Sequence, residues 1–309
     1  MERGESVRTY ELALTPGSRQ VRLDGKAVRP ASRYFGGFQV VLFAPEDLTV
    51  ARGAPADRRA FLDRAVFQRA PEYLGEAQDY DKVLRSRNAV LRAAQGRGGG
   101  GAGSARDSAG LLAVYDQRLA ELGARRIRRR ASLVAELTPR LRAAFGAISG
   151  GDLVADASYA PAWLDGADDL GDESELAARL ARALAAARAV DLARAVTTVG
   201  PHRDDLVLTL DGRSAASFAS QGQLRALILA WKISELELLS ETHGEAPVLL
   251  LDDVSSELDP QRNEYLFDFL SSKRTQVFVT TTHPSHVLAT SDRMDFEVRS
   301  GTVTRQNAG

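Results

Sequence analysis

An uninterrupted apolar run that ends in two adjacent carboxylates constrains the fold of this chain more than any other feature. The run is Val248-Leu249-Leu250-Leu251, and Asp252 and Asp253 follow it directly. Four apolar residues without a polar interruption predict a strand that is buried on both faces, as in a parallel α/β sheet. The two carboxylates then lie at the carboxyl edge of the sheet, where open α/β sheets bind their ligands.

Two neighbouring aspartates at such an edge repel each other, and they are costly to bury unless a cation neutralises them. Mg²⁺ bound to nucleotide phosphates meets this requirement, because it needs only one or two protein carboxylates and keeps several waters. We therefore interpret Asp252 and Asp253 as part of a nucleotide site. The alternative is a buried strand whose aspartates cap the helix that follows.

A polar turn precedes an apolar helix upstream of this strand. The turn consists of Ser220, Gln221, Gly222 and Gln223, and residues 224–233 have the apolar pattern of a helix. Backbone N–H groups, a hydroxyl and amides at the positive end of a helix are suited to binding an anion. The alternative is an ordinary capping box, in which Ser220 caps the helix and Gln223 bonds back to it.

The order and spacing of these elements resemble the second half of an ABC-type ATPase head. In that resemblance residues 220–223 match the signature motif, residues 248–253 the Walker B strand and residues 255–259 the D-loop. Further segments narrow the resemblance to the RecF family, the bacterial recombination and gap-repair ATPases: residues 40–48, 52–63, 80–88 and 200–206. The resemblance covers nearly the whole chain and implies an α/β fold, the ABC/SMC-type ATPase head, with a helical arm.

A phosphate loop, which such a head needs, is not found in the sequence. The loop requires G-x-x-x-x-G-K-[ST], whose N–H groups and lysine hold phosphates. Gly25-Lys26 has Gln20 in place of the first glycine, and the glycines of residues 98–103 are followed by Ser104 instead of lysine. We interpret the chain as starting after the phosphate-loop strand and helix, and favour an upstream start or a fragment over a shortened protein. The exposed sheet edges and apolar surface would make this form poorly soluble or partly unfolded when expressed alone.

The resemblance implies a role for each motif residue. Asp252 would hold Mg²⁺, and Asp253 would polarise the attacking water. The switch that senses the γ-phosphate would be Thr282 or His283. The alternative is that His283 is an ordinary loop histidine. The signature and D-loop residues would contact ATP held by a second subunit and the interface with it. They are Ser220, Gln221, Gly222, Gln223 and Asp259.

The function implied by the resemblance is an ATP-dependent homodimer that clamps single-stranded and gapped double-stranded DNA and helps to load recombinase. It would act in recombinational gap repair, replication restart and SOS induction, with RecR and RecO as partners. Whether this chain binds or hydrolyses ATP stays open. One alternative is a nucleotide-independent DNA-binding remnant. A transporter ATPase subunit is disfavoured, because residues 45–48 and 200–205 have no counterpart there.

The pattern of the chain predicts three regions. Residues 1–55 alternate as a β-rich first part of the head, residues 56–195 form a helical arm, and residues 196–309 alternate strands and helices as the second part of the head. Within the arm, helices are expected over residues 58–91, 111–145 and 174–195. Residues 96–110 are expected to be a flexible Gly-rich loop.

A run of arginines interrupts the apolar stripe of the long arm helix. Arg126 and Arg130 occupy positions where Leu122 and Leu133 predict a buried face, so we expect this part of the helix to project into solvent. It is then either a solvated arm tip with acidic neighbours or a surface that contacts DNA phosphates. The candidate DNA-binding residues are Arg125, Arg126, Arg128, Arg129 and Arg130.

Composition agrees with a cytoplasmic protein that has no membrane role. No cysteine is present, which excludes disulfides and thiolate sites, and the net charge of −1 requires any DNA surface to be local. No apolar run is long enough to span a bilayer. His202, Arg203 and Asp204 are predicted to be a structural ion-pair cluster more than a catalytic one.

Overall fold

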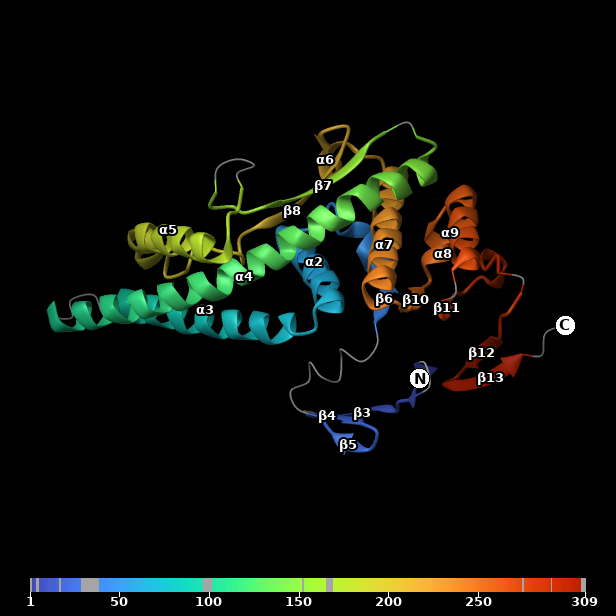
Figure 1. Cartoon of the computed structure of the whole chain (residues 1–309), viewed down its shortest axis with the longest axis horizontal. Helices are drawn as coiled ribbons and strands as arrows, with labels where there is room; N and C mark the ends of the chain where they lie inside the picture. The colour runs from blue at the N-terminus through green and yellow to red at the C-terminus, as the bar shows by residue number, and fades with distance from the viewer. Residues whose placement is uncertain are drawn as a thin grey trace.

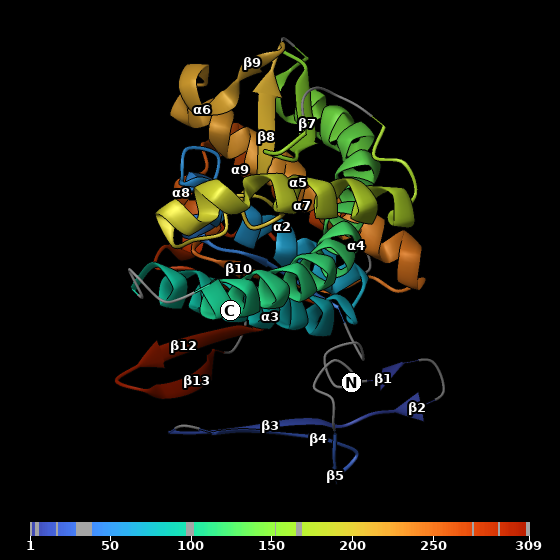
Figure 2. The same cartoon turned by 90° about the vertical axis from the view of Figure 1, so that its left-hand side faces the viewer.

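The computed structural model describes residues 2–3, 6–16, 18–28, 39–96, 102–151, 153–164, 169–273, 275–289 and 291–306. A body of sheets and helices carries a long helical arm, and the two chain termini lie on the same side of the body (Figures 1 and 2). None of the described helices is both long and apolar enough to cross a membrane.

A three-stranded parallel sheet lies in the body, in the order β11-β10-β6. Its strands are β6 (Val40–Phe43), β10 (Val248–Asp252) and β11 (Val277–Thr280). The predicted strand that carries the two aspartates is confirmed as β10. One face of the sheet is buried in the main apolar core together with residues of α7 (Gln221–His243), as the low exposure of Val41, Phe43 and Leu251 shows.

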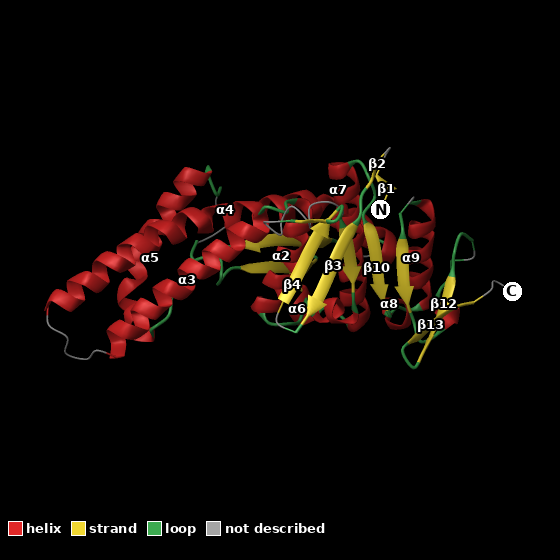
Figure 3. Cartoon of the chain, turned by 90° about the horizontal axis from the view of Figure 1, so that it is seen from below, coloured by secondary structure: helices red, strands yellow, loops and turns green. Residues whose placement is uncertain are grey.

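The prediction that this strand is buried on both faces is wrong. Leu250 pairs in register with Leu42 and Phe278, whose side chains are 45% and 54% exposed. Figure 3 shows the strands of this sheet from the side on which no described helix covers them. Buried and less buried residues alternate along the strand because α7 packs against only one face of the sheet. The apolar side chains on the other face agree with the exposed apolar surface expected from the sequence.

The helical arm is confirmed. Its helices are α2 (Pro55–Arg69), α3 (Tyr73–Gly96), α4 (Ala102–Ser149) and α5 (Glu173–Arg194). Helices α3 and α5 both pack along α4, which continues into the body and packs against α7 (Figure 1). The helix expected over residues 58–91 is two helices, since Pro71 lies between α2 and α3 and disfavours a continuous helix.

The Gly-rich loop expected over residues 96–110 is shorter than predicted. Helix α4 already begins at Ala102, and α3 ends at Gly96. Alanine and arginine in residues 102–106 favour a helix enough to offset Gly103. Residues 97–101 lie outside the described part of the chain.

An antiparallel sheet covers the junction between arm and body. Its strands are β7 (Ala155–Ala160), β8 (Asp205–Leu210) and β9 (Arg213–Ser214), followed by the short helix α6 (Ala215–Phe218). Strand β7 packs on α4 and β8 on α2. The turn of residues 200–205 leads into β8, so it lies where the arm meets the body.

Short strands form the two ends of the chain. At the N-terminus are β1 (Glu2–Arg3), β2 (Ser6–Val7), β3 (Tyr10–Thr15), β4 (Ser18–Leu23) and β5 (Lys26–Ala27), and at the C-terminus are β12 (Asp295–Arg299) and β13 (Thr302–Gln306). The predicted β regions are confirmed where they are described. The domain limits at residues 55 and 195 stay predictions.

Candidate functional site

Asp252 and Asp253 lie at the carboxyl edge of the central sheet, as predicted, and Thr280 of the neighbouring strand holds both. The Thr280 hydroxyl donates to Asp252 Oδ1 at 2.5 Å, and the Asp253 N–H donates to that hydroxyl and to the Thr280 carbonyl, each at 3.1 Å. One hydroxyl can serve in this way as donor and acceptor at once. Asp252 remains exposed, so its carboxylate faces solvent at the edge.

Asp253 has a left-handed backbone, with φ of 49°, a conformation that aspartate tolerates better than most residues. It stands at the N-cap of the four-residue helix α8 (Val254–Glu257), but its side chain makes no capping hydrogen bond. The alternative reading of these aspartates, as helix caps, therefore lacks its hydrogen bond at Asp253.

The turn at residues 220–223 forms a capping box at the start of α7. Ser220 Oγ accepts from the Gln223 N–H at 3.2 Å, and Gln223 Oε1 accepts from the Ser220 N–H at 2.8 Å. The Ser220 and Gln221 side chains are exposed. The first N–H groups of a helix have no partner within it, so the start of this long helix still presents donors and a positive dipole end. The capping and anion-binding readings are thus compatible.

The structure brings this turn together with the D-loop at two points. Arg225 donates to the Glu257 carboxylate at 2.6 Å and to the Glu257 carbonyl at 2.5 Å. Arg262 of α9 (Pro260–Ser272) forms an ion pair with Asp259 and covers Gly222, where an added Cβ would lie 3.2 Å from the guanidinium. Glycine at this position therefore lets α9 approach the first turn of α7 closely.

Asp259 also caps α9, since its Oδ1 accepts from the Arg262 N–H at 3.0 Å. Burial and the neighbouring Arg225 guanidinium lower the pKa of Arg262, which remains a cation at neutral pH.

Within this group, Gly222 and Asp259 were found from the sequence, whereas Arg225, Glu257 and Arg262 were missed because only the folded chain brings them together. Thr280 was also missed. It is the last residue of the next apolar strand after β10, and its place at a strand end on the ligand-binding edge of the sheet could have indicated it.

His283 lies after β11, in an exposed segment that ends with the short turn η2 (Pro284–His286). Its ring stacks on that of His286 with centroids 5.3 Å apart, and its Nδ1 lies 2.9 Å from the Thr282 hydroxyl. These contacts suit a loop histidine, and its role as a switch stays a prediction.

The expectation that the arginine run projects into solvent is wrong for Arg126 and Arg130, which are 8% and 0% exposed. Both guanidiniums bind Asp63 of α2, at 2.7 Å for Arg126 and at 2.6 and 2.8 Å for Arg130. The two cations hold the pKa of Asp63 at about 2 despite its burial. The carboxylate on the neighbouring helix is the physical reason why arginines occupy a buried stripe here.

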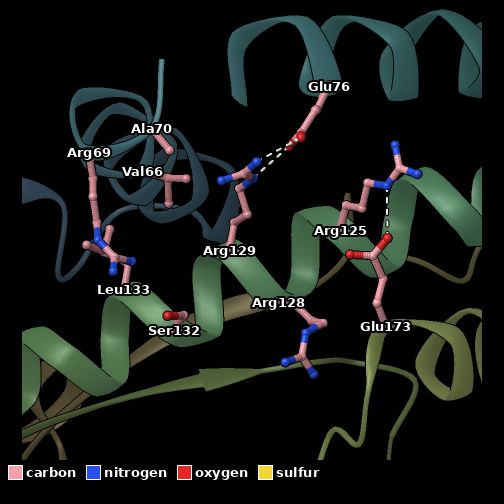
Figure 4. Close-up of a pocket in the computed structure, with 10 residues that line it drawn as sticks. All are labelled: Val66, Arg69, Ala70, Glu76, Arg125, Arg128, Arg129, Ser132, Leu133 and Glu173. Atoms are coloured by element: carbon pink, nitrogen blue, oxygen red, sulfur yellow. Dashed lines mark hydrogen bonds and ion pairs between the residues drawn. The ribbon is translucent and has the colours of Figure 1, made fainter. Parts of the chain in front are cut away.

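The other arginines of the run line a cavity of about 480 Å³ between α2, α3, α4 and the start of α5 (Figure 4). Arg125 binds Glu173 at 2.9 Å, and Arg129 binds Glu76 at 2.8 Å. Arg128 donates to the Gly171 carbonyl. The cavity lining thus contains four arginines and two glutamates, and the DNA-binding role of this run stays a prediction.

His202 and Asp204 are held by hydrogen bonds from α3, from the segment after α5 and from β7, not by ion pairs with each other. His202 Nδ1 lies 2.8 Å from the Tyr80 hydroxyl and Nε2 3.0 Å from the Thr197 carbonyl, and burial lowers its pKa to about 4. Asp204 accepts from the Tyr159 hydroxyl at 2.6 Å, and burial raises its pKa to about 6. The expected structural role suits this arrangement, but the expected ion pairs are replaced by hydrogen bonds.

Within the described residues, no group of three or more His, Cys, Asp or Glu side chains is placed to hold a metal ion by itself. The exposed carboxylate of Asp252 beside Asp253 is instead a donor set suited to Mg²⁺ that arrives with phosphates and retains water. The residues present therefore fit the protein side of a metal–nucleotide site.

Known proteins resemble the chain over most of its length, although no protein-family model matches it. The DNA replication and repair protein RecF of Myxococcus xanthus is 47% identical over 289 residues, which are 93% of this chain and 73% of that protein. Two solved structures of the recombination mediator protein RecF in the RecFOR pathway, RecF-ATPrS and RecF-ATP, are each 30% identical, with TM-scores of 0.84 and 0.81. Each match covers 97% of this chain. It covers 76% of the RecF-ATPrS chain and 77% of the RecF-ATP chain.

Proposed function

The chain belongs to the RecF family of DNA replication and repair proteins, and on that premise we propose that it contributes the signature and Walker B half of an ATP-dependent DNA clamp. One observation carries this proposal: the turn at Ser220–Gln223 is fixed to the D-loop through Gly222 and Arg262. Two motifs far apart in the sequence thereby form one surface that presents helix N–H groups and an exposed serine to a ligand.

Each residue has a distinct task in this proposal. Asp252 holds Mg²⁺, and Asp253 orients the attacking water. The Thr280 hydroxyl donates to the Asp252 carboxylate and accepts from the Asp253 backbone N–H at the sheet edge. Ser220, Gln221, Gly222 and Gln223 face the γ-phosphate of ATP held by a second subunit, and Asp259 contacts that subunit. When bound, Mg²⁺-ATP supplies the transferable phosphoryl group, while these side chains supply positioning and charge stabilisation.

One of the two related structures is of RecF-ATP, which supports ATP as the nucleotide here. We further propose a homodimer that closes on single-stranded and gapped double-stranded DNA in recombinational gap repair, replication restart and SOS induction. RecR and RecO are the proposed partners, because the related structures belong to the RecFOR pathway. The proposed location is the cytoplasm, where the chromosome is. The proposed switch residue is Thr282 or His283, which follow β11.

Association with an ATP-loaded relative tests the proposal. The chain is mixed with RecF from Myxococcus xanthus, with and without ATP and Mg²⁺, and sedimentation velocity reports the hetero-complex. We expect a complex that needs ATP and is lost in Ser220→Arg, because arginine fills the phosphate position. Ser174→Arg, at an exposed serine of α5, is the matched control and should associate normally. A complex that forms equally without ATP, or that survives Ser220→Arg, contradicts the proposal.

A further inference from the structure

Helix α3 carries a row of cations on its exposed face. Lys82, Arg85 and Arg92 are all exposed, and within the described part of the chain none of them makes a hydrogen bond or an ion pair. At 100° per residue these positions fall within an arc of about 80°, so the three side chains leave the helix on one side. Ten residues at 1.5 Å each give the row a length of about 15 Å.

Carboxylates are missing from this part of the sequence. From residue 82 to residue 106 the chain contains no aspartate or glutamate. The exposed Asp79 lies one turn before Lys82 and forms no ion pair with it. By contrast, four of the five arginines of α4 that were the first candidates for DNA contact bind carboxylates, such as Glu173 for Arg125 and Glu76 for Arg129. The fifth, Arg128, donates to the Gly171 carbonyl. Within the described residues, α3 therefore carries three exposed cations without an ion pair on one face, and Arg182 and Arg194 of α5 are further exposed cations of the arm without one.

The side chains between the cations are small. Ala89 and Ala93 are exposed on the same side as the cations, Ser86 is half-buried, and no large exposed apolar residue belongs to α3. A membrane-binding helix needs an exposed apolar face, and the centre of a protein interface is rich in apolar and aromatic side chains. A flat row of cations separated by small residues instead suits a regular polyanion that approaches closely.

We propose that the exposed face of α3, through Lys82, Arg85 and Arg92, contacts the phosphate backbone of double-stranded DNA. This inference rests on the proposed function, because it names the surface by which the arm holds the clamped DNA. A length of about 15 Å along the duplex axis corresponds to roughly four phosphates of one strand at about 3.4 Å each. The contact is independent of base sequence, because the three cations are positioned to meet only the backbone.

The test compares the chain with the triple variant Lys82→Gln/Arg85→Gln/Arg92→Gln. Binding to a fluorescein-labelled duplex is measured by anisotropy from low to moderate salt. Each phosphate contact adds about 0.9 to the slope of log affinity against log salt, so the variant should reduce the slope by roughly 2 to 3 and weaken binding roughly 100-fold at about 0.1 M salt. Two duplexes of unrelated sequence should lose the same factor.

The control is Arg142→Gln/Arg299→Gln/Arg305→Gln, which removes three exposed cations from the body end of α4 and from the C-terminal hairpin. This control variant should keep most of the slope of log affinity against log salt concentration. Circular dichroism should show unchanged helix content in both variants. If the chain binds the duplex and the α3 variant binds equally well, the inference is overturned while the proposed DNA clamp stands. If the unmodified chain binds no duplex, the proposed function and this inference both fail.

Discussion

Replacing Asp63 by asparagine tests how the helices α2, α3 and α4 of the arm are held together. Asp63 receives hydrogen bonds from Arg126, Arg130 and the Tyr73 hydroxyl, and Arg130 is fully buried. A carboxyl whose pKa is lowered from 3.8 to about 2 contributes roughly 2 kcal/mol at neutral pH, because each pKa unit is worth about 1.4 kcal/mol. Leaving buried Arg130 without its partner costs about 3–5 kcal/mol. Asparagine keeps part of the hydrogen bonding, so we expect a loss of about 3 kcal/mol.

The assay is urea unfolding of the arm followed by far-ultraviolet circular dichroism, with Asp81→Asn as the matched control. Among the described residues Asp81 has Arg126 as its single ion-pair partner, and its side chain is 47% exposed, so its loss should cost less than about 1 kcal/mol. Because the folded pKa of Asp63 is depressed, its contribution is present above the ordinary pKa of 3.8 and is lost as pH falls through about 2. The difference between Asp63→Asn and the unmodified chain should therefore shrink over that interval. Equal losses in the two variants at neutral pH would refute the reasoning.

Three further results follow from the structure. The folded pKa of Asp204 is raised to about 6, so ionisation of its carboxyl destabilises the fold as pH rises from about 4 through 6. Asp204→Asn should therefore flatten the pH dependence of the urea midpoint over that range. An unchanged pH profile of the midpoint contradicts this. Gly222→Leu should displace Arg262 and abolish ATP-dependent association while circular dichroism stays constant, and retained association would show that this contact is dispensable. Leu42→Gln with Phe278→Gln should lower aggregation and binding of a hydrophobic dye, whereas a sharp cooperative melt of an unmodified chain that binds no dye would argue against an uncovered sheet face.

The edge aspartates and the signature turn could be predicted from the sequence, because their signals are local. An apolar run followed by carboxylates specifies a strand and its edge, and Ser220 with Gln223 specifies a helix start. The burial of β10 on one face only could not be predicted, since the run of residues 248–251 looks the same whether one face or both faces are covered. That outcome depends on α7 packing against one side only.

The arginine run shows why charge patterns are harder to interpret. Arg126 and Arg130 continue the spacing of the buried stripe, and that spacing was the correct indicator of where they lie. Their partner Asp63 is on another helix, so the sequence offered no local sign that a carboxylate compensates them. The free cations of α3 had a clearer signal, the absence of acidic residues from residue 82 to residue 106, which composition over the whole chain conceals.

The most direct test of the central claim is to label the residues that meet the γ-phosphate in trans. RecF from Myxococcus xanthus is loaded with an ATP analogue that carries a photoreactive group on its γ-phosphate, mixed with this chain and irradiated, and mass spectrometry identifies the labelled peptide. The account predicts label on residues 214–225 of this chain, dependent on the relative and competed by ATP. Label that is absent from this peptide, or that appears without the relative, would contradict a signature surface offered to a second subunit.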